Sequence, residues 1–75
     1  SQNPGQKDYK TRLQEHFAKK GLKVNYEDTS HGPDHDKSFS TDVLLDGKII
    51  GNGVGKSKKS AQQSAAKDAL NKLNA

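Results

Sequence analysis

The chain has 75 residues, no cysteine and a formal net charge of +4. A chain of this length forms one small domain with a modest core, and without cysteine it has no disulfide and no thiolate metal site. No apolar run approaches the roughly 20 residues that span a bilayer, so we expect no membrane segment. The missing cysteines suit a reducing compartment, and we expect a cytoplasmic protein.

The positive charge is concentrated at the C-terminal end. From Lys56 onward five lysines face a single acid, Asp68, whereas residues 1–55 are neutral. A basic balance confined to one element predicts a polyanionic partner.

Residues 1–7 have no hydrophobic periodicity and contain Pro4 and Gly5. We interpret them as a linker or in part an artificial remnant, and residues 8–75 as the folded domain. A linker at this position leads us to expect a C-terminal module of a longer protein.

Asp8 is a candidate N-cap for a helix that runs to about Lys20, with Gly21 as its C′ residue. The spacing of Tyr9, Leu13 and Phe17 predicts a buried stripe on this helix. The opposite face is polar and carries Thr11, Gln14, Glu15 and Ala18.

Alternating patterns predict antiparallel strands over residues 23–29 and 37–46, joined by a Gly-Pro-Asp turn within residues 30–36. Asp46-Gly47 is typical of a two-residue hairpin turn, and a third strand follows over residues 48–52. We expect the glycines of residues 51–55 to form a turn that leads into the last helix.

The last helix is predicted from the N-cap Ser57 to about Leu73. Its inner stripe consists of small and apolar residues: Ala61, Ala65, Ala66, Ala69, Leu70 and Leu73. The element order predicts an α+β fold, an α-β-β-β-α two-layer sandwich whose three-stranded antiparallel sheet carries both helices on one face.

The start of the last helix departs from ordinary helix electrostatics. A helix N-terminus carries a partial positive charge, which favours acids there, yet this one bears Lys56, Lys58 and Lys59. Lysines alone are more often a solvated surface, but at this position, after glycines, they favour phosphate binding.

Other motifs are weaker. Gly55-Lys56-Ser57 is no P-loop, because Ile50 occupies the required first glycine position, and the dinucleotide pattern lacks its third glycine. His31 and His35, together with Asp34 and Asp36, have the ordinary composition of a loop rather than of a metal site. No catalytic constellation is visible.

In combination, three blocks resemble a double-stranded RNA-binding domain over residues 8–73. They are Asp8-Tyr9-Lys10-Thr11-x-Leu13-Gln14-Glu15, Gly32-Pro33-x-His35-Asp36-Lys37-x-Phe39, and the run from Gly51 through Lys58-Lys59 to Ala66. The chain is most similar to the C-terminal domain of bacterial ribonuclease III.

The resemblance implies that the domain binds double-stranded RNA by its A-form shape over about 16 base pairs. It implies three contact regions: Thr11, Gln14 and Glu15 in one minor groove, Pro33 and His35 in the next, and Lys56, Lys58 and Lys59 on the phosphates between them. Many relatives carry a further basic residue where this chain has Gln62, so we expect a gentler salt dependence.

The resemblance also implies that this domain alone is no enzyme and needs no cofactor. Cleavage of double-stranded RNA, with a divalent metal such as Mg²⁺, and dimerisation would belong to an upstream nuclease domain of the parent ribonuclease III. The alternative is the same module in a non-enzymatic RNA-binding adaptor, or in a protein-interaction or dimerisation module.

Overall fold

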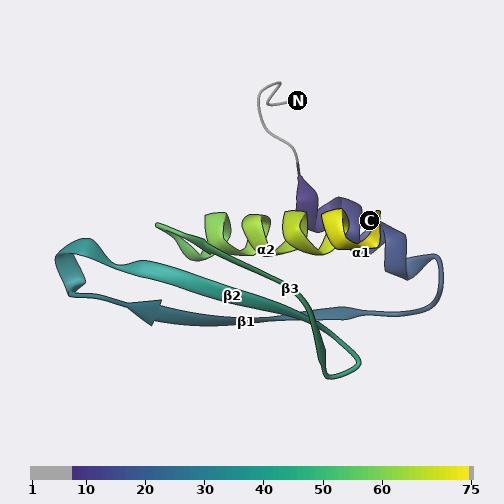
Figure 1. Ribbon diagram of the computed structural model, residues 1–75, viewed down its shortest axis with the longest axis horizontal. Helices are drawn as coiled ribbons and strands as arrows, with labels where there is room; N and C mark the ends of the chain where they lie inside the picture. The colour runs from purple at the N-terminus through teal and green to yellow at the C-terminus, as the bar shows by residue number, and fades with distance from the viewer. Residues whose placement is uncertain (1–7, 75) are drawn as a thin grey trace.

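The computed structural model describes residues 8–74, so the predicted linker, residues 1–7, lies outside the described part. The elements are α1 (Tyr9–Ala18), β1 (Val24–His31), the 3₁₀ turn η1 (Asp34–Asp36), β2 (Ser38–Leu45), β3 (Lys48–Gly55) and α2 (Lys58–Leu73). The strands form one antiparallel sheet in the order β1-β2-β3. Both helices lie over the same face of this sheet (Figure 1), which confirms the predicted α-β-β-β-α fold. Within residues 8–74, no helix is long and apolar enough to cross a membrane.

Helix α1 has the two caps that its sequence predicts. The Asp8 carboxylate accepts a hydrogen bond from the Thr11 amide at 3.1 Å. At the other end Gly21 has a φ of +73°, and the amides of residues 21 and 22 donate back to the carbonyls of the last helical turn at 3.0 and 2.9 Å. This pattern is a Schellman cap. The Lys20 amide donates to the Phe17 carbonyl, three residues back, at 2.9 Å, so the last turn is tighter than an α-helix and the regular helix ends at Ala18, two residues before the predicted end.

The hairpin between β2 and β3 also follows its sequence. Asp46 and Gly47 have φ values of 52° and 80°, the two positive angles that a type I′ turn requires. A register shift leaves Ile50 without a partner on β2. Ile50 thereby packs against the core, while its neighbour Ile49 is 58% exposed.

The glycines of residues 51–55 belong to a strand, so the predicted turn is wrong. Strand β3 continues to Gly55, three residues beyond the predicted end. A Cβ atom on Gly51 would lie 2.7 Å from the Ala65 carbonyl oxygen, and one on Gly53 would overlap the Ala65 amide. The missing side chains therefore let α2 pack directly on the backbone of β3.

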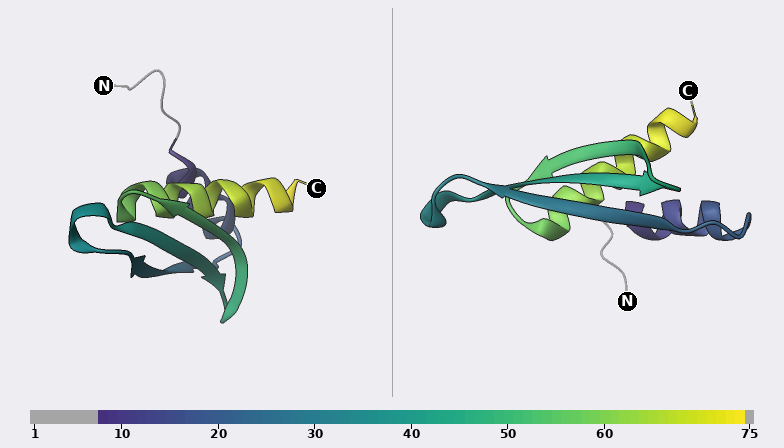
Figure 2. Two further views of the ribbon diagram at one scale, coloured as in Figure 1. Left: turned by 60° about the vertical axis from the view of Figure 1, so that its left-hand side comes forward. Right: turned by 90° about the horizontal axis from the view of Figure 1, so that it is seen from below.

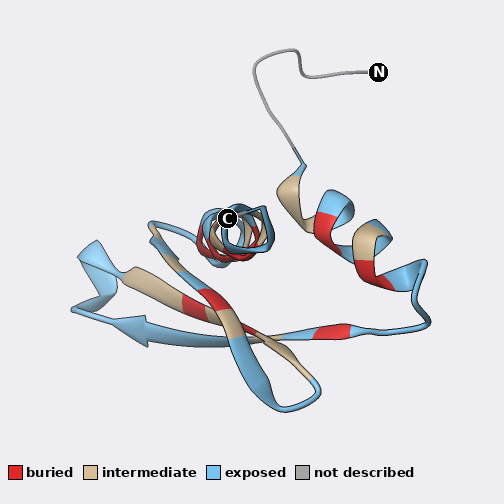
Figure 3. Ribbon diagram, turned by 45° about the vertical axis from the view of Figure 1, so that its right-hand side comes forward, coloured by how far each residue is buried: buried red, intermediate tan, exposed pale blue. Residues whose placement is uncertain are grey.

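The core lies between the sheet and the two helices (Figure 3). Its buried residues are Leu13, Phe17, Val24, Val43, Ala61, Ala65, Ala66 and Ala69. Leu70 packs against this core and is half-buried. Leu73, predicted on the inner stripe, is instead 42% exposed, because the last turn of α2 reaches beyond the sheet (Figure 2).

Candidate nucleic-acid interface

The start of α2 is neutral at its cap and positive in its first turn. Ser57 and Ser60 form a capping box: the Ser60 amide donates to the Ser57 hydroxyl at 3.1 Å, and the Ser57 amide donates to the Ser60 hydroxyl at 3.2 Å. No acid occupies the first turn. Lys58 and Lys59 are exposed, and within residues 8–74 neither forms an ion pair. This end of α2 thus presents uncompensated positive charge to solvent.

The single acid of the basic segment is used inside the fold. Asp68 accepts a hydrogen bond from the Asn52 amide of β3 at 2.9 Å and forms an ion pair with Lys72 at 3.0 Å. The bond from the Asn52 amide, supported by Lys72, lowers the pKa of Asp68 below its usual range. Asp68 lies on the third turn of α2, so it does not offset the lysines at the helix start.

The loop between β1 and β2 is compact and joined to the start of α2. Gly32 has a φ of +88°, and a Cβ there would lie 2.9 Å from the Asp36 carbonyl oxygen. The Asp36 carboxylate pairs with Lys56 at 3.3 Å. The predicted contact residues Pro33 and His35 are both exposed in this loop, which extends past the helices at the end of the β1–β2 hairpin (Figure 1).

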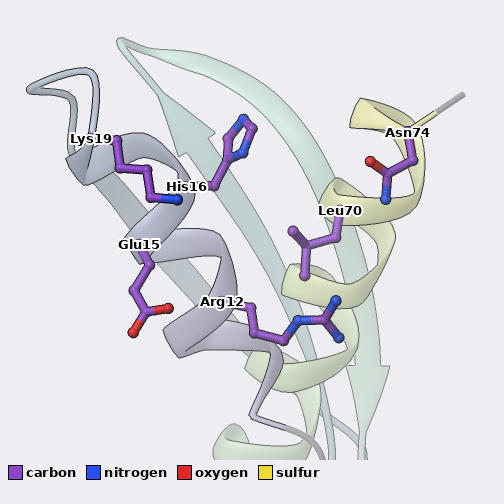
Figure 4. Close-up of a pocket in the computed structure, with 6 residues that line it drawn as sticks. All are labelled: Arg12, Glu15, His16, Lys19, Leu70 and Asn74. Carbon is purple, nitrogen blue, oxygen red and sulfur yellow. The ribbon is translucent and has the colours of Figure 1, made fainter.

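The polar face of α1 is exposed as predicted. Thr11, Gln14 and Glu15 are all accessible to solvent. The Thr11 hydroxyl donates to the Asp8 carboxylate at 2.5 Å, which leaves its oxygen lone pairs as acceptors. Glu15 points away from α2 (Figure 4).

Gln62, which stands where many relatives carry a basic residue, forms hydrogen bonds within the fold. Its amide donates to both carboxylate oxygens of Asp28, at 2.9 and 3.2 Å, and its carbonyl accepts from the Lys10 ammonium at 2.6 Å. Asp28 also accepts from the buried Thr41 hydroxyl at 2.6 Å. Gln62 therefore belongs to a polar network that joins both helices to the sheet.

A shallow, open groove separates α1 from the end of α2 (Figure 4). It is lined by Arg12, Glu15, His16, Lys19, Leu70 and Asn74. The lining mixes both signs of charge with a single apolar side chain, so it offers no defined chemistry for a small ligand.

The three predicted contact regions lie one after another along the molecule rather than in one cluster. The β1–β2 loop is at one end, the start of α2 is in the middle and α1 is at the other end (Figure 1). Side-chain contacts link the outer regions to α2 and to the residue before its cap: Lys56 pairs with Asp36 of the loop, and Gln63 of α2 contacts the start of α1. The arrangement suits an elongated ligand.

The open face of the sheet has the opposite electrostatic character. Glu27 on β1 lies directly across from Asp42 on β2. Side chains alternate along a strand, and Tyr26 and Val43 face the helices, so these two acids point away from them. Two facing carboxylates disfavour a polyanion on this side.

The contacts of three residues beside these regions could not be predicted from the sequence: Lys10, Asp36 and Gln63. Each acts through a partner distant in sequence, so no local pattern marks it. The one available signal is that Gln62 and Gln63 interrupt the alanines of α2 at the edge of its buried stripe.

Comparisons with known proteins agree with this geometry. Residues 9–73 match the model of the double-stranded RNA binding motif. The chain is 46% identical to ribonuclease 3 of Latilactobacillus sakei over 93% of its own length and 51% identical to ribonuclease 3 of Nocardia farcinica over 91%. It spans only 31% and 29% of those two proteins.

Solved structures give the same result. A structure of Arabidopsis HYL1, described for its implications for miRNA processing, superposes with a TM-score of 0.81 at 40% identity, covering 89% of this chain and 97% of that one. A structure of both double-stranded RNA-binding domains of DRB4 superposes with a TM-score of 0.71 at 35% identity, covering 88% of this chain and 44% of that one. The chain therefore belongs to the double-stranded RNA-binding domain family.

Proposed function

We propose that this domain binds double-stranded RNA by its A-form shape, through two minor grooves and the phosphates between them. The observation that carries the proposal is the start of α2, where Lys58 and Lys59, which have no ion pair within residues 8–74, add to the positive helix end and the first turn holds no acid. The acidic open face of the sheet leaves the side bearing the helices and the loop for a polyanion.

The three regions would divide the work. Lys56, Lys58 and Lys59 contact phosphates, which gives affinity without reading sequence. Thr11, Gln14 and Glu15 contact ribose 2′-hydroxyls in one minor groove, because a carboxylate or hydroxyl oxygen accepts from that group. Pro33 and His35 enter the next minor groove, with the His35 ring as a hydrogen-bond donor.

The parent protein is proposed to be a ribonuclease III that cleaves and processes double-stranded RNA. The support is the identity to two bacterial ribonucleases 3, of which this chain matches less than a third. This domain would hold the substrate, and cleavage with Mg²⁺, as well as dimer formation in the cytoplasm, would belong to the remainder of such a protein.

The test compares a 20-base-pair RNA duplex with the DNA duplex of the same sequence, by fluorescence anisotropy at several salt concentrations. We expect markedly tighter binding to RNA, because only RNA presents the 2′-hydroxyls and the A-form grooves. Equal affinity for the two duplexes would contradict the proposal.

A second candidate is the same module in an RNA-binding protein without nuclease activity. The resemblance to DRB4, whose structure holds two such domains and a linker, favours it. Incubation of the full-length parent with double-stranded RNA and Mg²⁺ separates the two, since only a ribonuclease III shortens the RNA.

A further inference from the structure

We infer that Gln63 is a positioning residue, which fixes the RNA-reading face of α1 relative to the lysines of α2. The inference rests on the proposed function. It concerns a side chain of α2 that reaches the start of α1, 54 positions away in sequence.

The Gln63 side chain, which belongs to α2, caps the N-terminus of α1. Its carbonyl oxygen accepts from the Tyr9 amide at 2.8 Å and from the Lys10 amide at 3.4 Å. These are two of the N–H groups that a helix start leaves without partners. Asp8 covers a third, the Thr11 amide.

The other end of the same side chain holds the cap itself. The Gln63 nitrogen donates to the Asp8 carboxylate at 3.0 Å, and Asp8 in turn accepts from the Thr11 hydroxyl at 2.5 Å. A continuous chain of hydrogen bonds thus runs from α2 to a residue of the proposed minor-groove face. Because the Thr11 proton is committed to Asp8, its outward lone pairs can accept from a ribose 2′-hydroxyl.

The lysines lie on the same helix within one turn. Lys59 and Gln63 are four residues apart, so they project from one face of α2. One turn further on, the Lys67 ammonium lies 5.7 Å from the centre of the Tyr9 ring. One face of α2 therefore carries a phosphate contact and two contacts to the first turn of α1. A displacement of α1 would change the spacing between the two contact regions.

The experiment uses two variants that alter this link differently. Gln63→Leu removes all three hydrogen bonds at nearly constant volume. Gln63→Glu keeps the acceptor for the Tyr9 and Lys10 amides but places a second carboxylate against Asp8. Asn71→Ala, an exposed residue further along α2, is the control. Circular dichroism at low temperature confirms that each variant is folded, and Gln63→Glu carries the test if Gln63→Leu does not fold.

We expect each Gln63 variant to bind the 20-base-pair RNA about three- to tenfold more weakly, the range that loss of one or two net hydrogen bonds gives. The salt slope and the affinity for the DNA duplex should stay near those of the parent domain, because the lysines are intact. A second readout is the pKa of Asp8, followed by NMR titration, which should rise in both variants and most in Gln63→Glu.

The outcomes are distinct. Equal losses for RNA and DNA in folded variants, an unchanged pKa of Asp8, or an unchanged RNA affinity would each overturn the positioning role. If the parent domain itself fails to distinguish RNA from DNA, the proposed function fails instead.

Discussion

The two helices of this domain begin in opposite ways. Helix α1 starts with a carboxylate cap, and its first N–H groups are satisfied by Asp8 and by Gln63 of the other helix. Helix α2 starts with a neutral serine box followed by two exposed lysines. The negative cap of α1 suits the positive end of the helix dipole, and its N–H groups are bonded within the fold. The lysines of α2 oppose that dipole and remain exposed to solvent. The contrast indicates that the N-terminus of α1 is bonded within the protein, whereas the N-terminus of α2 is available to a ligand.

The largest effect is expected from a substitution of Gly55, the strand residue on which the N-terminus of α2 packs. A Cβ on Gly55 would overlap the Ser60 hydroxyl and lie 2.7 Å from the Ala61 amide, within the capping box. We expect Gly55→Ala to lower the free energy of unfolding by about 1–3 kcal/mol, as overpacking usually does. Urea denaturation measures it. Val54→Ala, at a neighbouring position that is 69% exposed, is the control and should change stability little.

Removing the charge should affect binding without affecting the fold. The double variant Lys58→Ala with Lys59→Ala should bind RNA at least about tenfold more weakly. Its log-log salt slope should fall by up to about 1.8, since each neutralised phosphate contributes about 0.9 on a B-form duplex. Anisotropy titrations at several salt concentrations measure both. The charge-matched control, Lys19→Ala with Lys20→Ala, should keep the slope; a silent Lys58–Lys59 pair would refute the phosphate contact.

A substitution on the polar face of α1 should lower the selectivity for RNA over DNA rather than the electrostatic attraction to phosphates. Glu15→Ala should weaken binding to the RNA duplex by about fivefold, the value of one hydrogen bond, with little change in salt slope. Binding to DNA should not weaken, so the ratio of the two affinities falls. Glu27→Ala makes the same charge change on the open sheet face and should leave the ratio unaltered. An equal effect of the two variants would mean that Glu15 acts only through its charge.

The smallest effect concerns pH and belongs to the α1 cap. The hydrogen bond from the Thr11 hydroxyl, followed by that from Gln63, lowers the pKa of Asp8 to about 2 from 3.8. A group with a lowered pKa in the folded state stabilises the fold above its unfolded pKa, and this contribution is lost as pH falls from about 4 to about 2. Thermal melts across this range should show a loss of stability that Asp8→Asn reduces. Asp68, whose pKa is also lowered, contributes in the same direction and remains in that variant.

The local features of the fold are predictable from sequence because each is decided within a few residues. The Asp8 and Ser57 caps, the Gly21 terminus and the Asp46-Gly47 turn all depend on side chains or φ angles close in the chain. The continuation of β3 over residues 53–55 is not predicted from the sequence, because glycine in isolation favours a turn. Only the backbone of α2, brought there by the fold, shows why side chains must be absent.

In the candidate site, too, local features are predictable from the sequence and contacts between distant residues are not. Its exposed residues on α1, the loop and α2 could be named from their motifs, although their contacts with RNA remain predictions. The links between them could not. The sequence marks Gln62 only as a position without a basic residue, and it does not show that the Gln62 amide donates to Asp28 of β1, 34 positions away.

The seating of α2 on a row of glycines has a consequence for how this sequence can change. The height of the lysine-bearing helix above the sheet is set by backbone atoms of β3 and by alanines, not by large side chains. Any side chain added at Gly51, Gly53 or Gly55 would therefore meet α2 directly. Substitution of one of these glycines would move the lysine-bearing helix away from the sheet, although none of the three belongs to the predicted contact residues.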